Sequence, residues 1–229
     1  MTTSATTLLG PGVLWTVPAP WLNVEERSWD ARRARATRAR ALPSVLARLA
    51  RAQAAAGQQE AAKLTLLEAI GLASTLDHRD GVTLDVLLEL ARASALRGQT
   101  RAAADLLRVL WRDAYPRKLG VALEAATMLA ALHPDARGLT WATVALHAAS
   151  AAKTDEARRW VTFAQVTLGD VFLALGLPER AERAYAKALR SVEAVETRGL
   201  WDIQSALEHA RGAMMNIRGT LGTHAPHLT

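Results

Sequence analysis

The sequence contains no cysteine among its 229 residues. That absence excludes disulfides, thiol catalysis and thiolate metal sites within it, and it fits a cytoplasmic protein, as we expect this chain to be. Lysine is also scarce, so arginine carries almost all of the net charge of +6; the four lysines are Lys63, Lys118, Lys153 and Lys187. Such a charge can attract acidic proteins or nucleic acid, but it does not specify a fold.

Long apolar runs and strand-like alternation are missing too. Hydrophobic residues make up 50% of the chain, yet Glu124, His147 and Arg158 interrupt the best candidates for a membrane span, so we expect a soluble protein. The start, MTTSATTLLGPG, lacks the basic residues and the cleavage-like site of a secretory signal. Alanine, leucine and arginine dominate over β-branched residues, which predicts an all-α fold.

One order of small and large residues recurs along the chain, and its clearest copy covers residues 165–189. Two helices must approach closely there, which explains a small Gly169 facing a small Ala181. Gly176 is expected to end the first helix at positive φ, and Pro178 fits the first turn of the second helix. The pattern is completed by Leu168, Phe172, Tyr185, Ala188 and Leu189.

Further copies are predicted at the same offsets. The turn glycines Gly57, Gly98 and Gly176 are 41 and 78 residues apart, so another copy is expected between residues 115 and 152, with its turn at residues 133–135. The matching residues are Leu49, Ala50, Ala62, Leu66, Ala69 and Ile70 in the first copy, Leu90, Ala91, Ala103, Leu107, Leu110 and Trp111 in the second, and Ala126, His133, Gly138 and Ala145 in the third.

This order of residues resembles the tetratricopeptide (TPR) repeat, and its spacing of about 40 residues is similar to extended repeats of bacterial regulatory proteins. The resemblance implies a right-handed α-solenoid of about four helix-turn-helix repeats. We expect an arm at residues 1–22, a repeat domain at 23–222 that begins with a leading helix and ends with a capping helix, and a mobile tail at 223–229. The resemblance also implies a scaffold or regulatory module for protein–protein interaction, not an enzyme.

The resemblance further implies that a peptide or partner domain binds in the concave groove. Arg51 and Arg92 hold equivalent positions one repeat apart, so both are predicted to face the groove and take an acidic side chain or a terminal carboxylate. The alternative is that both are solvated arginines. The resemblance places on this face Arg51, Arg92, Leu88, Phe163, Val166 and Asp170, along with Ala47, Ala54, Ala55, Ala95, Leu96 and Leu173. The asparagine and lysines of chaperone-binding members are absent, so a chaperone is not the expected partner.

An arginine-rich helix is predicted at residues 23–42, because Asn23 can cap it and acidic residues follow in its first turn. We expect its arginines to be solvated, since they spread around the helix axis. The alternative is a nucleic-acid-binding surface that contacts phosphates. The residues concerned are Arg32, Arg33, Arg35, Arg38 and Arg40.

Both ends of the chain leave alternatives open. The arm, with Trp15 and Trp21 and the following Trp29, either packs on the first helices or docks on a partner. The last helix either caps the final repeat or provides a self-association face. Its apolar seam consists of Leu200, Ile203, Leu207, Ala210, Met214 and Ile217. No metal spacing, phosphate loop or nucleophile–base pair occurs locally, so we predict no catalytic residue, metal or cofactor.

Overall fold

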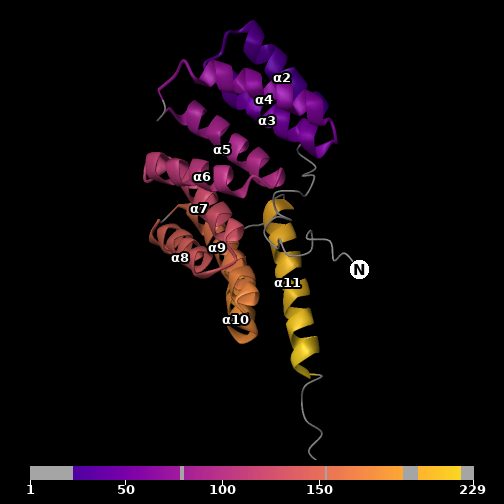
Figure 1. The fold of residues 1–229 in the computed structure, drawn as a ribbon, viewed down its shortest axis with the longest axis vertical. Coiled ribbons are helices and arrows are strands. Elements are labelled where there is room, and N and C mark those ends of the chain that lie inside the picture. Colours follow the sequence, from indigo (N-terminus) through magenta and orange to yellow (C-terminus); the bar gives the residue numbers. More distant parts are fainter. Residues whose placement is uncertain (1–22, 78–79, 153, 193–200, 223–229) are drawn as a thin grey trace, which may run out of the picture. The chain divides into compact units, whose positions relative to one another are not determined.

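The computed structural model describes residues 23–77, 80–152, 154–192 and 201–222. Within these ranges all regular structure is helical, with ten helices and no strand, which confirms the predicted all-α fold (Figure 1). None of the described helices is long and apolar enough to cross a membrane. The helices are α2 (Val24–Ala36), α3 (Leu42–Ala55), α4 (Gln59–Ala73), α5 (Gly81–Leu96), α6 (Thr100–Ala114), α7 (Leu119–Leu132), α8 (Ala136–Ala151), α9 (Asp155–Ala174), α10 (Pro178–Val192) and α11 (Trp201–Gly222).

The described chain forms two compact units that divide within α7. In the N-terminal unit, residues 23–125, α2 packs on α3, α3 on α4, and α5 on α3, α4 and α6. Small side chains in the contacts let these helices approach closely, which is what the alanine-rich pattern predicts. One core cluster of this unit contains Ala31, Leu46, Ala47, Leu49, Ala69, Ala73 and Val86.

In the C-terminal unit, residues 126–222, α9 packs on α8 and α10, and α11 packs on α9 and α10. The apolar seam predicted for the last helix is confirmed over its described part, because its residues lie in the core that α9 and α10 share with α11. The seam is therefore used within the chain. Its buried residues are Ile203, Leu207, Ala210 and Ile217, with Met214 packed against them.

The predicted turns are confirmed. Gly57, Gly98 and Gly176 follow the ends of α3, α5 and α9 with φ of 79°, 74° and 71°, a conformation that glycine adopts without strain. Residues 133–135 connect α7 to α8. The close approach expected at Gly169 is also confirmed, because a Cβ added there would overlap the ring of Tyr185. The nearest atoms thus belong to Tyr185 and not to Ala181, which was expected to face this glycine.

The predicted leading helix at residues 23–42 is wrong at its C-terminal end. Helix α2 starts after the expected cap, Asn23, but it ends at Ala36. Arg38 then adopts a left-handed conformation with φ of 49°, and a new helix, α3, begins at Leu42 with Pro43 in its first turn. The predicted end at Leu42 relied on the rule that the residue before a proline avoids the helical conformation. Leu42 and Pro43 instead lie in the first turn of α3, where proline is favourable, and the break between the helices comes earlier in the chain.

Several expectations concern residues outside the described ranges: the arm with Trp15 and Trp21, the tail at 223–229, and Leu200 of the seam. Trp29 lies on α2 with 65% of its surface exposed, and the guanidinium of Arg32 lies 5.4 Å from the centre of its ring.

Candidate functional site

A groove of about 450 Å³ opens between α3, α4 and α5 in the N-terminal unit. Its volume falls within the range typical of ligand-binding pockets. We call it the alanine groove, because alanines supply six of its lining residues. It is lined by Ala47, Ala50, Arg51, Ala54 and Ala55 of α3, Gln59, Ala62, Lys63 and Leu66 of α4, and Glu89, Arg92, Ala93 and Leu96 of α5 with the adjoining Arg97.

Most of the apolar side chains that line the alanine groove are short. Alanine side chains project little from their helices, so a ligand backbone can approach α3 and α5 closely. Leu96 adds a large apolar side chain that is 51% exposed, whereas Leu66 is buried. A surface of this kind suits a peptide with small or medium apolar side chains.

Arg92 is the most deeply buried charge in the alanine groove, with 2% of its surface exposed. Its guanidinium donates hydrogen bonds to Glu89, three residues earlier on α5, and to Glu124 on α7. Burial by itself lowers the pKa of Arg92, but the negative charges and hydrogen bonds of the two glutamates raise it above its ordinary value. Arg92 is therefore a permanently charged, doubly paired residue.

The accessible positive charge comes from three other side chains. Arg51 has a side chain that is 28% exposed, and its Nη1 lies 3.7 Å from Oε1 of Glu89. Lys63 is 52% exposed and lies 4.0 Å from Glu60. Arg97 is exposed and forms no ion pair with any residue that the structure describes. These cations outnumber the one carboxylate of the lining, Glu89, which Arg92 already holds.

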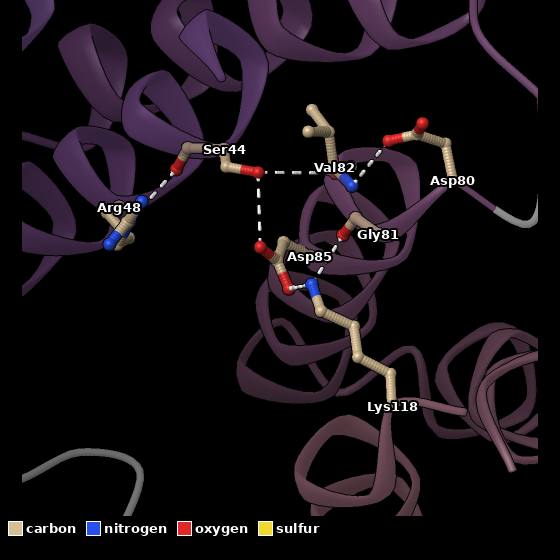
Figure 2. A network of polar contacts seen from close by, with 7 residues as sticks. All are labelled: Ser44, Arg48, Asp80, Gly81, Val82, Asp85 and Lys118. Carbon is tan, nitrogen blue, oxygen red and sulfur yellow. Dashed lines mark hydrogen bonds and ion pairs between the residues drawn. The ribbon is translucent and has the colours of Figure 1, made fainter. Parts of the chain in front are cut away.

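A polar network fixes two walls of the alanine groove. Figure 2 shows Asp85 of α5 between Ser44 of α3 and Lys118, which precedes α7. The Ser44 hydroxyl donates to Asp85 over 3.1 Å, and the Lys118 ammonium donates to Asp85 and to the Gly81 carbonyl, each over 2.7 Å. Asp80 caps α5 by accepting from the Val82 N–H over 2.8 Å. These contacts fix the position of α3 relative to α5.

The structure brings together only some of the predicted groove residues. Of these residues, Arg51, Arg92, Ala47, Ala54, Ala55 and Leu96 line the alanine groove. Leu88 is buried, with 6% of its surface exposed, and it is not among the lining residues. Phe163 and Val166 lie in the core of the C-terminal unit, in the same cluster as the seam of α11. Helix α11 therefore covers the face of α9 that these two residues occupy.

Asp170, the last predicted groove residue, joins the three helices of the C-terminal unit. It accepts a hydrogen bond from the Tyr185 hydroxyl of α10 over 2.6 Å, and its Oδ1 lies 2.7 Å from Nε2 of His209 of α11. Burial, and then the charge of Asp170, raises the pKa of Tyr185. The hydrogen bond to Asp170 raises the pKa of His209, against the opposing effect of burial.

Replacing His209 by glutamine is expected to remove a pH-dependent stabilisation. Its folded pKa is raised above the ordinary 6.5, so the contribution is complete below that pH and is lost as the pH rises through the folded pKa. We expect the variant to lose on the order of 1 kcal/mol at about pH 6 and much less at about pH 9, measured by urea unfolding. Glu208→Gln, one residue earlier and exposed, is the matched control. A loss for His209→Gln that is equal at both pH values would contradict the assignment.

The arginines predicted for nucleic-acid binding do not form one free surface. Arg35 pairs with Glu68 of α4 over 2.6 Å, and Arg40 pairs with the helix cap Asp80. Arg32 lies against Trp29. Arg33 and Arg38 remain exposed, and neither forms an ion pair within the described part of the chain. Arg38 and Arg40 also lie outside α2, because the helix ends earlier than predicted.

Reading the sequence missed Lys63, Glu89 and Arg97 as groove residues. Glu89 had a local signal, since an acid three residues before Arg92 lies on the same helix face. Lys63 follows the predicted small residue Ala62, but only the packing of α4 against α5 directs it to the groove. No cluster of three metal-binding side chains occurs among the residues described. No protein-family model and no curated protein matches the chain.

Proposed function

We propose that this protein is a TPR-like interaction module whose alanine groove binds a peptide segment of a partner protein. The observation that carries the proposal is the lining itself: a groove with an alanine surface and three partly or fully exposed cations, Arg51, Lys63 and Arg97. Helix pairs joined at positive-φ glycines, with small residues in their contacts, support the TPR-like repeat.

The alanine groove supports this function better than nucleic-acid binding for a physical reason. Affinity for nucleic acid depends mainly on the number of free cations that reach phosphates. Arg35 and Arg40 are instead neutralised by glutamate and aspartate of the same unit. The alanine groove combines a concave apolar surface with the exposed Arg97 and with Lys63 and Arg51, whose ion pairs of 4.0 Å and 3.7 Å are longer than the 2.6 Å pair of Arg35. Apolar surface with such cations is the chemistry that recognises an acidic peptide.

Panning a random peptide library against the purified full-length chain tests the proposal. We expect acid-rich peptides to be enriched, and we expect their affinity to fall about tenfold or more in Lys63→Glu combined with Arg97→Glu, because two attractive charges become repulsive. The readout is fluorescence anisotropy of labelled peptides from the enriched pool, with a free or an amidated C-terminus.

The matched control is Arg101→Glu combined with Arg108→Glu, which makes the same change of charge on α6, a helix that lines no part of the alanine groove. The proposal fails if no peptide is enriched, or if both double variants weaken binding equally. In the second case the peptides respond to net charge and not to the groove. Duplex DNA of mixed sequence, tested alongside, should bind weakly and lose affinity steeply with salt.

A further inference from the structure

Glu89 lines the alanine groove, although its negative charge is unfavourable in a site for acidic ligands. A site that recognises acidic ligands loses affinity when it contains a carboxylate of its own. Yet Glu89 lines the groove, and its side chain is 12% exposed. It pairs with two arginines at once, Arg92 behind it and Arg51 in front of it.

The two pairings are unequal. Glu89 accepts a close hydrogen bond from Arg92, whereas its Oε1 lies 3.7 Å from Nη1 of Arg51. That separation exceeds the 2.7–2.9 Å or so of a charge-assisted hydrogen bond. Arg92 is itself held by Glu124 on its other side. The side chains of Arg51, Glu89, Arg92 and Glu124 therefore alternate in charge, with the buried Arg92 between Glu89 and the 25% exposed Glu124. The loosest contact of the series is the one between Arg51 and Glu89.

We infer that Glu89 is an internal competitor for the ligand's carboxylate, and that ligand binding exchanges the Glu89–Arg51 contact for a ligand–Arg51 contact. Arg51 is the residue that touches the ligand, and Arg92 is a positioning residue that keeps Glu89 in place. The inference rests on the proposed function, because it assigns roles within the same groove.

The exchange leaves no buried charge unpaired, which is why it is energetically feasible. When Arg51 turns to a ligand carboxylate, Glu89 keeps its hydrogen bond from Arg92. If Arg92 were the ligand-binding residue instead, its guanidinium would have to leave Glu89 or Glu124. Arg92 is only 2% exposed, so this would break a buried ion pair. Removing one partner of a buried ion pair is costly, so that route is disfavoured. The competition also sets a threshold: a ligand without a negative charge gains nothing at Arg51 that Glu89 does not already provide.

The test is Glu89→Gln, a substitution of nearly the same shape that removes the competing charge while Glu124 continues to pair with Arg92. The probe is a fluorescein-labelled peptide of alternating Glu and Ala with Leu at its centre, with a glutamine analogue as the neutral probe. Each is made with a free and with an amidated C-terminus, which separates side-chain from terminal carboxylates. We expect Glu89→Gln to bind the acidic probe about tenfold more tightly and the neutral probe unchanged.

Two further variants separate competition from a general change of charge. Glu60→Gln removes an acid that is 86% exposed beside Lys63, and it should change affinity little because solvent screens it. Arg51→Met should weaken binding of the acidic probe. Adding Glu89→Gln to Arg51→Met should not increase the affinity for this probe. If Glu89→Gln still increases the affinity when Arg51 is replaced, the inference is wrong.

The failure of this inference differs from the failure of the proposed function. If wild type and Glu89→Gln bind the acidic probe equally, Glu89 does not compete, and groove binding stands. If neither protein binds the acidic probe, and the panning also enriches no peptide, the proposed function falls and the inference falls with it.

Discussion

Replacing Gly138 by alanine is expected to destabilise the C-terminal unit by about 3 kcal/mol. Gly138 lies in the first turn of α8, against the end of α7. A Cβ added there would overlap the carbonyl oxygen of His133 and lie 2.6 Å from that of Ala130. Both obstacles are backbone atoms, so no side-chain rotation relieves the overlap. The methyl group can be accommodated only if α8 moves away from the turn that starts it.

The matched control for Gly138→Ala is Gly212→Ala in α11 of the same unit. An added Cβ at Gly212 meets no atom within 4 Å. Alanine is the better helix former by about 1 kcal/mol, so this control should be neutral or stabilising. Thermal unfolding followed by circular dichroism compares the two variants with the wild type. A Gly138→Ala protein as stable as the control would show that α7 and α8 are not in close contact at this turn.

Much of the helix arrangement could be predicted because it follows from local size and turn chemistry. A small residue at one position of a helix permits close packing, and a glycine at the end of a helix permits a positive φ. Gly169 and Gly138 occupy such small positions, and both proved to be close contacts. The C-terminal seam was predictable for a similar reason, since its spacing places one apolar stripe on one side of a helix.

The alanine groove was harder to predict because its chemistry depends on contacts between distant helices. The offset from Arg51 identified Arg92 as a groove residue, and the structure places it in the lining. The repeat offset does not predict the contact with Glu124, which lies 32 residues further along the chain and accepts a hydrogen bond from Arg92. That contact turns an apparently available cation into a buried, paired one.

The same limit applies to the last predicted repeat. Phe163, Val166 and Asp170 were assigned to an open face because they share offsets with Arg51 and its neighbours. Equal offsets imply equal exposure only if each repeat has the same neighbours. Helix α11 packs on α9 and α10, and the cluster that contains its seam also contains Phe163 and Val166. A terminal helix therefore changes the role of these residues without any change in their local pattern.

Replacing Glu89 and Glu124 together by glutamine is expected to cost about 3–5 kcal/mol of stability. The double substitution leaves the Arg92 guanidinium, with its side chain 3% exposed, without either of its carboxylate partners. Glutamine can still accept a hydrogen bond, so the packing is nearly preserved while the neutralising charge is lost. The single variant Glu89→Gln should cost much less, because Glu124 still pairs with Arg92. Urea unfolding of the single and double variants measures the difference.

Adding Arg92→Met to the double variant should recover most of that stability, because methionine fills similar volume without a charge. A double variant as stable as wild type would contradict the buried ion-pair assignment, and so would a triple variant that recovers nothing. Recovery would also show that folding does not require the buried charges. Their remaining role would then be the one proposed for the alanine groove. Arg92 keeps Glu89 beside Arg51, and only a ligand with a negative charge replaces the contact between Glu89 and Arg51.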